Sequence, residues 1–111
     1  MEPAGGVLTN THLNSESVGL IGAGLLGTAL ATRLVSAGFS LLSYDPEAAA
    51  VERLARLGAK VAVSPEQVAQ TCWRILFSLP APPQVASTVD RIESHLRPGA
   101  IILDTTTGDP E

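Results

Sequence analysis

Residues 18–27 read VGLIGAGLLG, and this stretch decides the fold of the 111-residue chain. Its first four residues are a short apolar run typical of a buried strand, and the remainder follows the spacing G-x-G-x-x-G. The residues that follow place Leu26, Leu30 and Leu34 on one face of a helix, which we expect to end before Gly38. A strand, a glycine-rich turn and a helix in this order predict the first half of a β-α-β unit.

The rest of the chain repeats this alternation of short apolar runs and helical patterns. Further strands are predicted at residues 41–44, 60–63, 74–79 and 100–103. Helices are predicted at residues 46–57, from residue 65 after a stretch that resembles a capping box, and at residues 83–96. This alternation predicts an α/β fold, a Rossmann-like, doubly wound parallel sheet in a single domain. We expect the strand order 3-2-1-4-5, with a ligand crevice between the first and fourth strands.

Composition and charge narrow the class of protein. The net charge is −4, from 7 Lys and Arg against 11 Asp and Glu, and no basic cluster is present. This acidic net charge argues against nucleic acid as a partner. No apolar run reaches the roughly 18 residues of a membrane span, so no membrane partner is expected. The single cysteine, Cys72, excludes an internal disulfide and favours a reducing compartment, so we expect a cytoplasmic location.

The first residues differ from the rest of the chain. Residues 1–17 are polar, lack periodicity and contain no Lys or Arg, so we interpret them as a flexible N-terminal segment rather than a targeting signal. Residues 18–111 are then the single folded domain. His12 has no neighbouring metal-ligand residue types, and no nucleophile accompanies His95, so neither histidine predicts a metal or catalytic site.

The three glycines of the turn have separate physical roles in a dinucleotide-binding turn. Gly22 permits the tight turn, Gly24 lets the backbone approach a pyrophosphate, and Gly27 lets the helix pack closely on the strand. The helix N-terminus offers free N–H groups to phosphate, and no acidic side chain lies in its first turn. The alternative is a strand–helix turn in which glycine serves packing alone. The context favours a dinucleotide.

Asp45 follows the second predicted strand, about 20 residues beyond the glycine turn. A carboxylate at this place hydrogen-bonds an adenosine ribose and repels the 2′-phosphate of NADP. The next residues are Pro46 and Glu47 rather than a basic residue, so we expect NAD to be preferred over NADP. Alternatively, Asp45 caps a helix that begins at Pro46, and the two roles can coexist.

Three longer stretches resemble the NAD-binding domain of the β-hydroxyacid dehydrogenases. The 3-hydroxyisobutyrate dehydrogenases are the nearest group, and the 6-phosphogluconate dehydrogenases are more distant. Residues 18–47 (VGLIGAGLLGTALATRLVSAGFSLLSYDPE) match the family's opening, with Leu26 where Met is usual. Residues 58–80 (GAKVAVSPEQVAQTCWRILFSLP) resemble the segment that leads to its Leu-Pro turn. Residues 101–110 (IILDTTTGDP) resemble its signature Asp-x-Ser-Thr-x-x-Pro, with Thr106 replacing Ser.

This resemblance implies positions for the binding residues. The signature Thr107 contacts the nicotinamide end, and Thr106 and Thr107 form the substrate side, where Thr106 helps to bind a carboxylate. Asp104 is expected to be structural, as an acceptor for nearby hydroxyl and N–H groups. The full set of expected cofactor-binding residues is Gly22, Ala23, Gly24, Leu25, Leu26, Gly27, Tyr44, Asp45, Leu79, Pro80, Gln84 and Thr107.

The resemblance also implies a reaction and a catalytic group. The family transfers hydride between a nicotinamide cofactor and a small β-hydroxyacid, and its lysine lies on a helix of a second, helical domain. Here the only lysine is Lys60, away from the predicted crevice, so no catalytic residue is assigned. We expect residues 1–111 to bind dinucleotide without useful turnover, and the full-length protein to be an active homo-oligomer.

Two other functions stay open at this point. One is a non-catalytic or regulatory dinucleotide-binding module. The other is an S-adenosylmethionine methyltransferase, which shares a glycine-rich loop and an acid after the second strand, but the Leu79-Pro80 and 104–107 motifs fit it less well.

Overall fold

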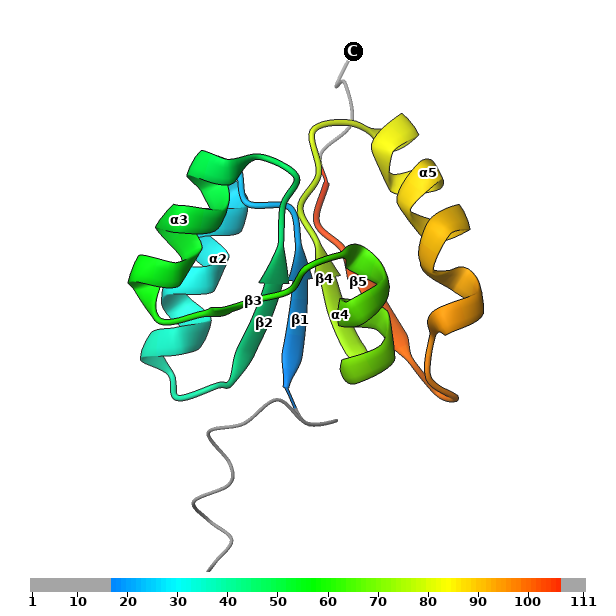
Figure 1. The fold of residues 1–111 in the computed structure, drawn as a ribbon, viewed down its shortest axis with the longest axis horizontal. Coiled ribbons are helices and arrows are strands. Elements are labelled where there is room, and N and C mark those ends of the chain that lie inside the picture. The colour runs from blue at the N-terminus through cyan, green and yellow to red at the C-terminus, as the bar shows by residue number, and fades with distance from the viewer. Residues whose placement is uncertain (1–16, 107–111) are drawn as a thin grey trace, which may run out of the picture.

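The computed structural model describes residues 17–106, which contain a five-stranded parallel sheet (Figure 1). The strand order is β3-β2-β1-β4-β5, as expected, and the α/β Rossmann-like fold class is confirmed. Its strands are β1 (Val18–Ile21), β2 (Leu41–Tyr44), β3 (Lys60–Val61), β4 (Arg74–Phe77) and β5 (Ile101–Asp104).

The register brings the carboxyl ends of four strands to one edge of the sheet. Ile21 at the end of β1 pairs with Tyr44 of β2 and with Phe77 of β4, and Phe77 pairs with Asp104 of β5. Polar segments that follow these strands therefore meet at that edge, which is where the crevice was expected.

Helices cover both faces of the sheet, as Figure 1 shows. Helices α2 (Leu25–Ser36) and α3 (Ala48–Leu57) lie on one face, where Leu20 and Leu41 are buried with Ala31 and Leu54. Helices α4 (Pro65–Thr71) and α5 (Pro82–Ile92), with the 3-10 turn η1 (Glu93–His95), lie on the other. Neighbouring residues of one strand thus belong to different cores, because strand side chains alternate between faces.

The buried face of α2 differs from the predicted one. Gly27 and Ala31 are buried, whereas Leu26 is 46% exposed and Leu34 is only partly buried. The helix starts so close to the glycine turn that no side chain fits at Gly27, where a Cβ would lie 2.4 Å from the Gly22 carbonyl oxygen. Gly27 and Ala31 therefore form the buried part of the helix. Of the three leucines predicted on one face, Leu34 packs against the core and Leu26 does not.

Several element boundaries also differ from the prediction. The predicted strands at residues 60–63 and 74–79 end earlier, at Val61 and Phe77. Helix α3 begins at Ala48 with Glu47 as its N-cap, so Asp45 does not cap it. The start of α4 is as expected, because the Ser64 hydroxyl accepts from the Gln67 N–H at 3.1 Å. The fold also includes Ser17, which is buried and lies 3.1 Å from the Ser40 hydroxyl.

One face of the β5 end of the sheet is open within residues 17–106. Ile101 and Leu103 are 57% and 58% exposed, because α2 and α3 cover the half of that face nearer β2.

No helix in the described part of the chain is long and apolar enough to cross a membrane.

Candidate functional site

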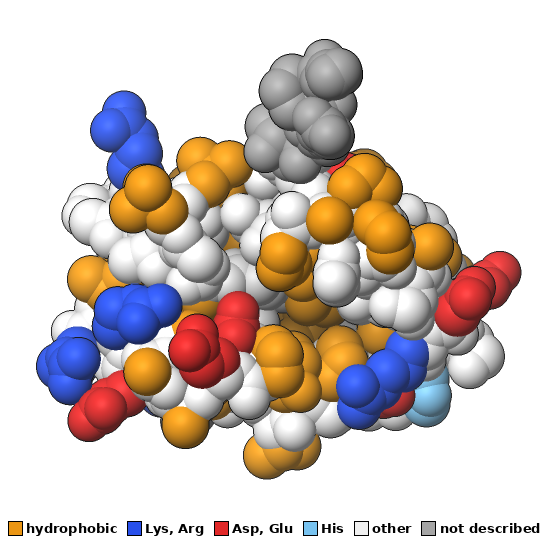
Figure 2. Space-filling model, turned by 90° about the horizontal axis from the view of Figure 1, so that it is seen from above, with side chains coloured by type: hydrophobic (Ala, Val, Ile, Leu, Met, Phe, Trp, Pro, Cys, Tyr) orange, Lys and Arg blue, Asp and Glu red, His pale blue; other side chains and the backbone are white. Residues whose placement is uncertain are grey.

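A cavity of about 810 Å³ lies at the carboxyl edge of the sheet, between the two helix pairs. Figure 2 looks onto this end of the molecule and shows the hollow with apolar side chains inside it. Ten of the predicted site residues line the cavity: Ala23, Gly24, Leu25, Leu26, Tyr44, Asp45, Leu79, Pro80, Gln84 and Thr106. The structure therefore gathers residues that are up to 83 positions apart in the sequence, from Ala23 to Thr106.

Gly22, Gly27 and Lys60, which were also considered from the sequence, do not line it, and Thr107 lies outside the described residues. Gly22 and Gly27 are buried beneath the turn that they shape, and Gly22 has a φ of +106°. Lys60 is exposed on β3 and is not part of the cavity wall. Thr107 lies outside the described residues, so its predicted contact with a nicotinamide ring stays a prediction.

The N-terminus of α2 opens into the cavity without a cap. Gly24 is the N-cap residue, no side chain among the described residues bonds to this helix end, and its first turn holds no acid. A Cβ on Gly24 would meet nothing within 4 Å, so the space above the turn is open. The first N–H groups of a helix lack intrahelical acceptors and carry partial positive charge, which suits a phosphate oxygen.

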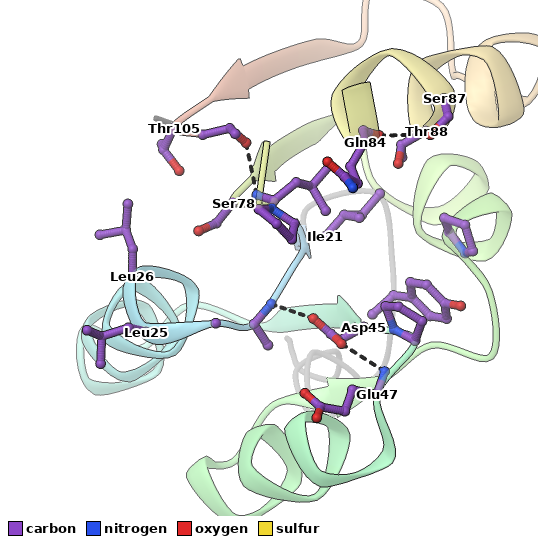
Figure 3. A pocket seen from close by; sticks show the side chains of 18 of the residues that line it. Ile21, Leu25, Leu26, Asp45, Glu47, Ser78, Gln84, Ser87, Thr88 and Thr105 are labelled. Atoms are coloured by element: carbon purple, nitrogen blue, oxygen red, sulfur yellow. Dashed lines mark hydrogen bonds between the residues drawn. The ribbon is translucent and has the colours of Figure 1, made fainter. Parts of the chain in front are cut away.

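The Asp45 carboxylate bonds to the backbone of the glycine turn at the edge of the cavity. Its Oδ2 accepts the Ala23 N–H at 2.8 Å, and its Oδ1 accepts the Glu47 N–H at 2.8 Å, as Figure 3 shows. The carboxylate is fixed in place, and each oxygen retains lone pairs toward the cavity that can accept from a hydroxyl group. This geometry explains why Asp45 fails as a helix cap: both of its oxygens bond to other backbone groups.

A second residue bonds to this turn, Arg53 of α3, and no sequence motif indicated it. Its Nη2 donates to the Ala23 carbonyl oxygen at 3.2 Å, and the Thr28 hydroxyl donates to the same oxygen at 3.1 Å. The Ala23 residue is thus bonded at its N–H by Asp45 and at its carbonyl by Arg53 and Thr28. Arg53 was missed because its position follows from the packing of α3 against α2.

The segments after β4 and β5 form the opposite wall. The Thr106 hydroxyl accepts the Leu79 N–H at 2.9 Å, and the Thr105 hydroxyl donates to the Phe77 carbonyl. Asp104 accepts the Thr106 N–H at 2.8 Å through Oδ1, which confirms its expected structural role. The Thr106 hydroxyl hydrogen is not used by Leu79, so it can donate to a ligand oxygen.

Helices α4 and α5 supply a third wall that sequence reasoning did not identify. Pro65, Ser87, Thr88 and Arg91 line it together with Gln84, and Figure 3 shows Ser87, Thr88 and Gln84 on one side of α5. Arg91 Nε lies 2.7 Å from Glu66 Oε2. That hydrogen bond lowers the pKa of Glu66 and raises the pKa of Arg91, so both groups stay charged.

Other reactive residue types lie elsewhere. Cys72 is fully buried, and burial raises the pKa of its thiol to about 11, which makes it a packing residue. His95 Nδ1 lies 2.9 Å from Gln70 Nε2 and does not line the cavity. Within residues 17–106 no group of three or more His, Cys, Asp or Glu side chains could hold a metal ion.

The comparison with protein families identifies a match that covers all of the described residues. Residues 17–111 match the family described as the NAD binding domain of 6-phosphogluconate dehydrogenase. A protein of Dictyostelium discoideum, named probable 3-hydroxyisobutyrate dehydrogenase, is 36% identical over 100 residues. The alignment covers 87% of this chain and 31% of that protein, so this chain spans about a third of the length of its relative.

Solved structures show the same fold. The 3-hydroxyisobutyrate dehydrogenase of Mycobacterium tuberculosis, solved with L-serine, superposes with a TM-score of 0.81 at 22% identity, over 85% of this chain and 32% of that one. The imine reductase of Myxococcus stipitatus with NADP+ gives a TM-score of 0.77 at 25% identity, over 85% and 33%. A variant of that reductase with NAD+ gives 0.77 at 26% identity, over 86% and 33%, so related sites hold either cofactor.

Proposed function

Because this chain belongs to the family of the NAD-binding domain of 6-phosphogluconate dehydrogenase, we propose that its cavity binds NAD as the cofactor site of a β-hydroxyacid dehydrogenase. The observation that carries the proposal is the uncapped N-terminus of α2, which opens into the same cavity as the Asp45 carboxylate. A dinucleotide needs both a donor group for its phosphates and an acceptor for its ribose hydroxyls. The family match favours a dinucleotide over S-adenosylmethionine.

Each part of the ligand has residues that fit it. The N–H groups at Gly24, Leu25 and Leu26 suit the pyrophosphate, and Asp45 suits the adenosine ribose. The wall that contains Leu79, Pro80 and Thr106 is left for the nicotinamide end, where the bound cofactor accepts or donates a hydride. Calorimetric titration of residues 1–111 with NAD tests this binding directly, and absence of binding would contradict it.

We infer that the site prefers NAD to NADP. Asp45 and Glu47 both line the cavity, and two carboxylates near the ribose repel a 2′-phosphate. An Asp45→Asn variant keeps the size of the side chain and removes one charge. Loss of a charged hydrogen bond of about 1.5–3 kcal/mol corresponds to roughly tenfold or more in affinity for NAD.

The matched control is Glu52→Gln, which removes one negative charge from α3, where Glu52 pairs with Arg56 and does not line the cavity. We expect the ratio of NAD affinity to NADP affinity to fall in Asp45→Asn and to stay at the wild-type value in Glu52→Gln. An unchanged ratio in Asp45→Asn would limit Asp45 to its bonds with Ala23 and Glu47.

For the whole protein we propose hydride transfer between NAD and a small β-hydroxyacid, with Thr106 on the substrate side. Relatives are named as dehydrogenases of 3-hydroxyisobutyrate and of L-serine, which are both small β-hydroxyacids. Lys60 lies outside the cavity wall, so the described residues place no lysine beside the substrate. We therefore expect residues 1–111 to bind NAD without turnover, and absorbance of reduced nicotinamide with 3-hydroxyisobutyrate or L-serine checks this.

Robust turnover by residues 1–111 would mean that another group in this chain takes the hydroxyl proton. NAD binding without turnover by the full-length protein would favour a non-catalytic or regulatory module instead. The cytoplasmic location and the homo-oligomeric state stay predictions from the sequence and its family resemblance.

A further inference from the structure

Three side chains from three different elements meet beside the cavity: Tyr44 of β2, Glu66 of α4 and Arg91 of α5. Tyr44 and Arg91 line the cavity, and Arg91 Nε donates to Glu66 Oε2 at 2.7 Å. The hydrogen bond with Glu66 is the main cause of the raised pKa of Arg91, with a smaller contribution from Tyr44. Glu66 thus holds the Nε edge of the guanidinium, and Tyr44 also interacts with the Arg91 side chain.

The order of groups in a nucleotide fixes what lies near these side chains. If the phosphates bind at the N-terminus of α2 and the ribose at Asp45, the base must extend from the ribose on the side away from α2. Tyr44 directly precedes Asp45. Pro65 of α4 and Thr88 of α5 also line the cavity, and Figure 3 shows Thr88 on the side of Asp45 away from α2. A planar base fits there, because the Tyr44 ring offers a flat aromatic face and the Pro65 ring an apolar one.

We propose that Arg91, oriented by Glu66, binds the adenine base of the cofactor and selects for a purine at this end of the cavity. This inference rests on the proposed function. A guanidinium plane stacks on aromatic rings, and its N–H groups can donate to the acceptor nitrogens of adenine. Arg91 contacts the ligand in this arrangement, and Glu66 is a positioning residue.

Two other roles for the pair are less consistent with its surroundings. As a stabilising surface ion pair it would contribute little, because the Arg91 and Glu66 side chains are 54% and 25% exposed. The pair would also attract phosphate only weakly, because the negative charge of Glu66 offsets the positive charge of Arg91 for any group at a distance.

The experiment compares fragments of the cofactor on residues 1–111. NAD, AMP and nicotinamide mononucleotide are titrated by calorimetry against wild-type protein, Arg91→Gln, Glu66→Gln and the control Arg56→Gln. Arg56 also pairs with a glutamate, at 3.3 Å on α3, so the control makes the same change in net charge away from the cavity. Thermal unfolding of each variant confirms that it is folded.

We expect Arg91→Gln to weaken AMP and NAD by about tenfold and to leave nicotinamide mononucleotide within twofold of wild type. Glu66→Gln should show a smaller loss for AMP, and Arg56→Gln should show none. Unchanged AMP affinity in Arg91→Gln would overturn the inference, and so would equal loss for AMP and nicotinamide mononucleotide, which would indicate a phosphate effect. If wild-type protein binds none of the three ligands, the proposed function itself is wrong.

Discussion

The glycines of the turn allow stability and cofactor binding to be separated by single substitutions. In Gly22→Ala, the new Cβ would lie 2.0 Å from the Ser78 carbonyl oxygen, and the backbone would keep a φ of +106°. Strain in this region costs about 1–2 kcal/mol, and overpacking against backbone that cannot move costs about 1–3 kcal/mol more. We therefore expect the free energy of unfolding to fall by about 2–5 kcal/mol, a large share of the roughly 5–15 kcal/mol of a typical domain.

Gly24→Ala is the matched variant two residues away. Gly24 has a φ of −72°, and its Cβ would meet nothing within 4 Å, so loss of a glycine N-cap should cost less than about 1 kcal/mol. The methyl group would nevertheless occupy the space that a pyrophosphate needs, so NAD affinity should fall. Urea unfolding followed by the fluorescence of Trp73, the single tryptophan, measures the first effect, and calorimetry measures the second. Equal stability of Gly22→Ala and wild type would refute the reasoning, and so would full NAD affinity in Gly24→Ala.

Three further results are expected. Cys72 should resist alkylation at pH 8 until urea unfolds the chain, and a thiol that reacts at once would contradict its burial. The free energy of unfolding should also decline as pH rises from about 9 to about 11, because the thiol of the unfolded chain ionises at lower pH than the buried thiol. Ser64→Ala should lower the free energy of unfolding by about 1 kcal/mol in urea titrations, since Ser64 caps α4 through the Gln67 N–H, whereas Ser64→Asp should retain most of it. Thr106→Val should lower the free energy of unfolding by about 1–3 kcal/mol, because it leaves the Leu79 N–H without its acceptor. Thr106→Ser keeps the hydroxyl and should retain the wild-type stability. Equal stability of the two variants would show that the bond contributes nothing.

Local patterns were sufficient to predict the order of the sheet and most of one side of the site. Each strand has its own apolar run, and residues that end a parallel strand must lie at one edge, so Asp45 and Leu79 could be placed in the cavity from position alone. The spacing G-x-G-x-x-G assigned Gly22 to the tight turn, and its positive φ confirms that role.

The side chains that the sequence did not reveal come from helices whose orientation depends on tertiary packing. Arg53 reaches Ala23 because α3 lies against α2, and Arg91 reaches Glu66 because α5 lies against α4. Neither arginine belongs to a local motif. Leu26 was predicted to share a helical face with Leu30 and Leu34. Gly27 and Ala31 are buried instead, and Leu26 lies at the cavity wall, where it was also expected as a cofactor-binding residue.

The bonding of Ala23 on both sides has a consequence for the rates of cofactor exchange. Its N–H and carbonyl groups already have partners within the protein, so the turn needs no rearrangement before a ligand arrives. Association of the cofactor should then be limited by diffusion and orientation, with rate constants near the upper part of the ordinary range. Substitutions at Arg53 should slow association, because they allow the turn to adopt other conformations. Differences in affinity among variants that keep this turn intact should instead appear in the lifetime of the complex, which stopped-flow displacement of bound reduced nicotinamide would measure.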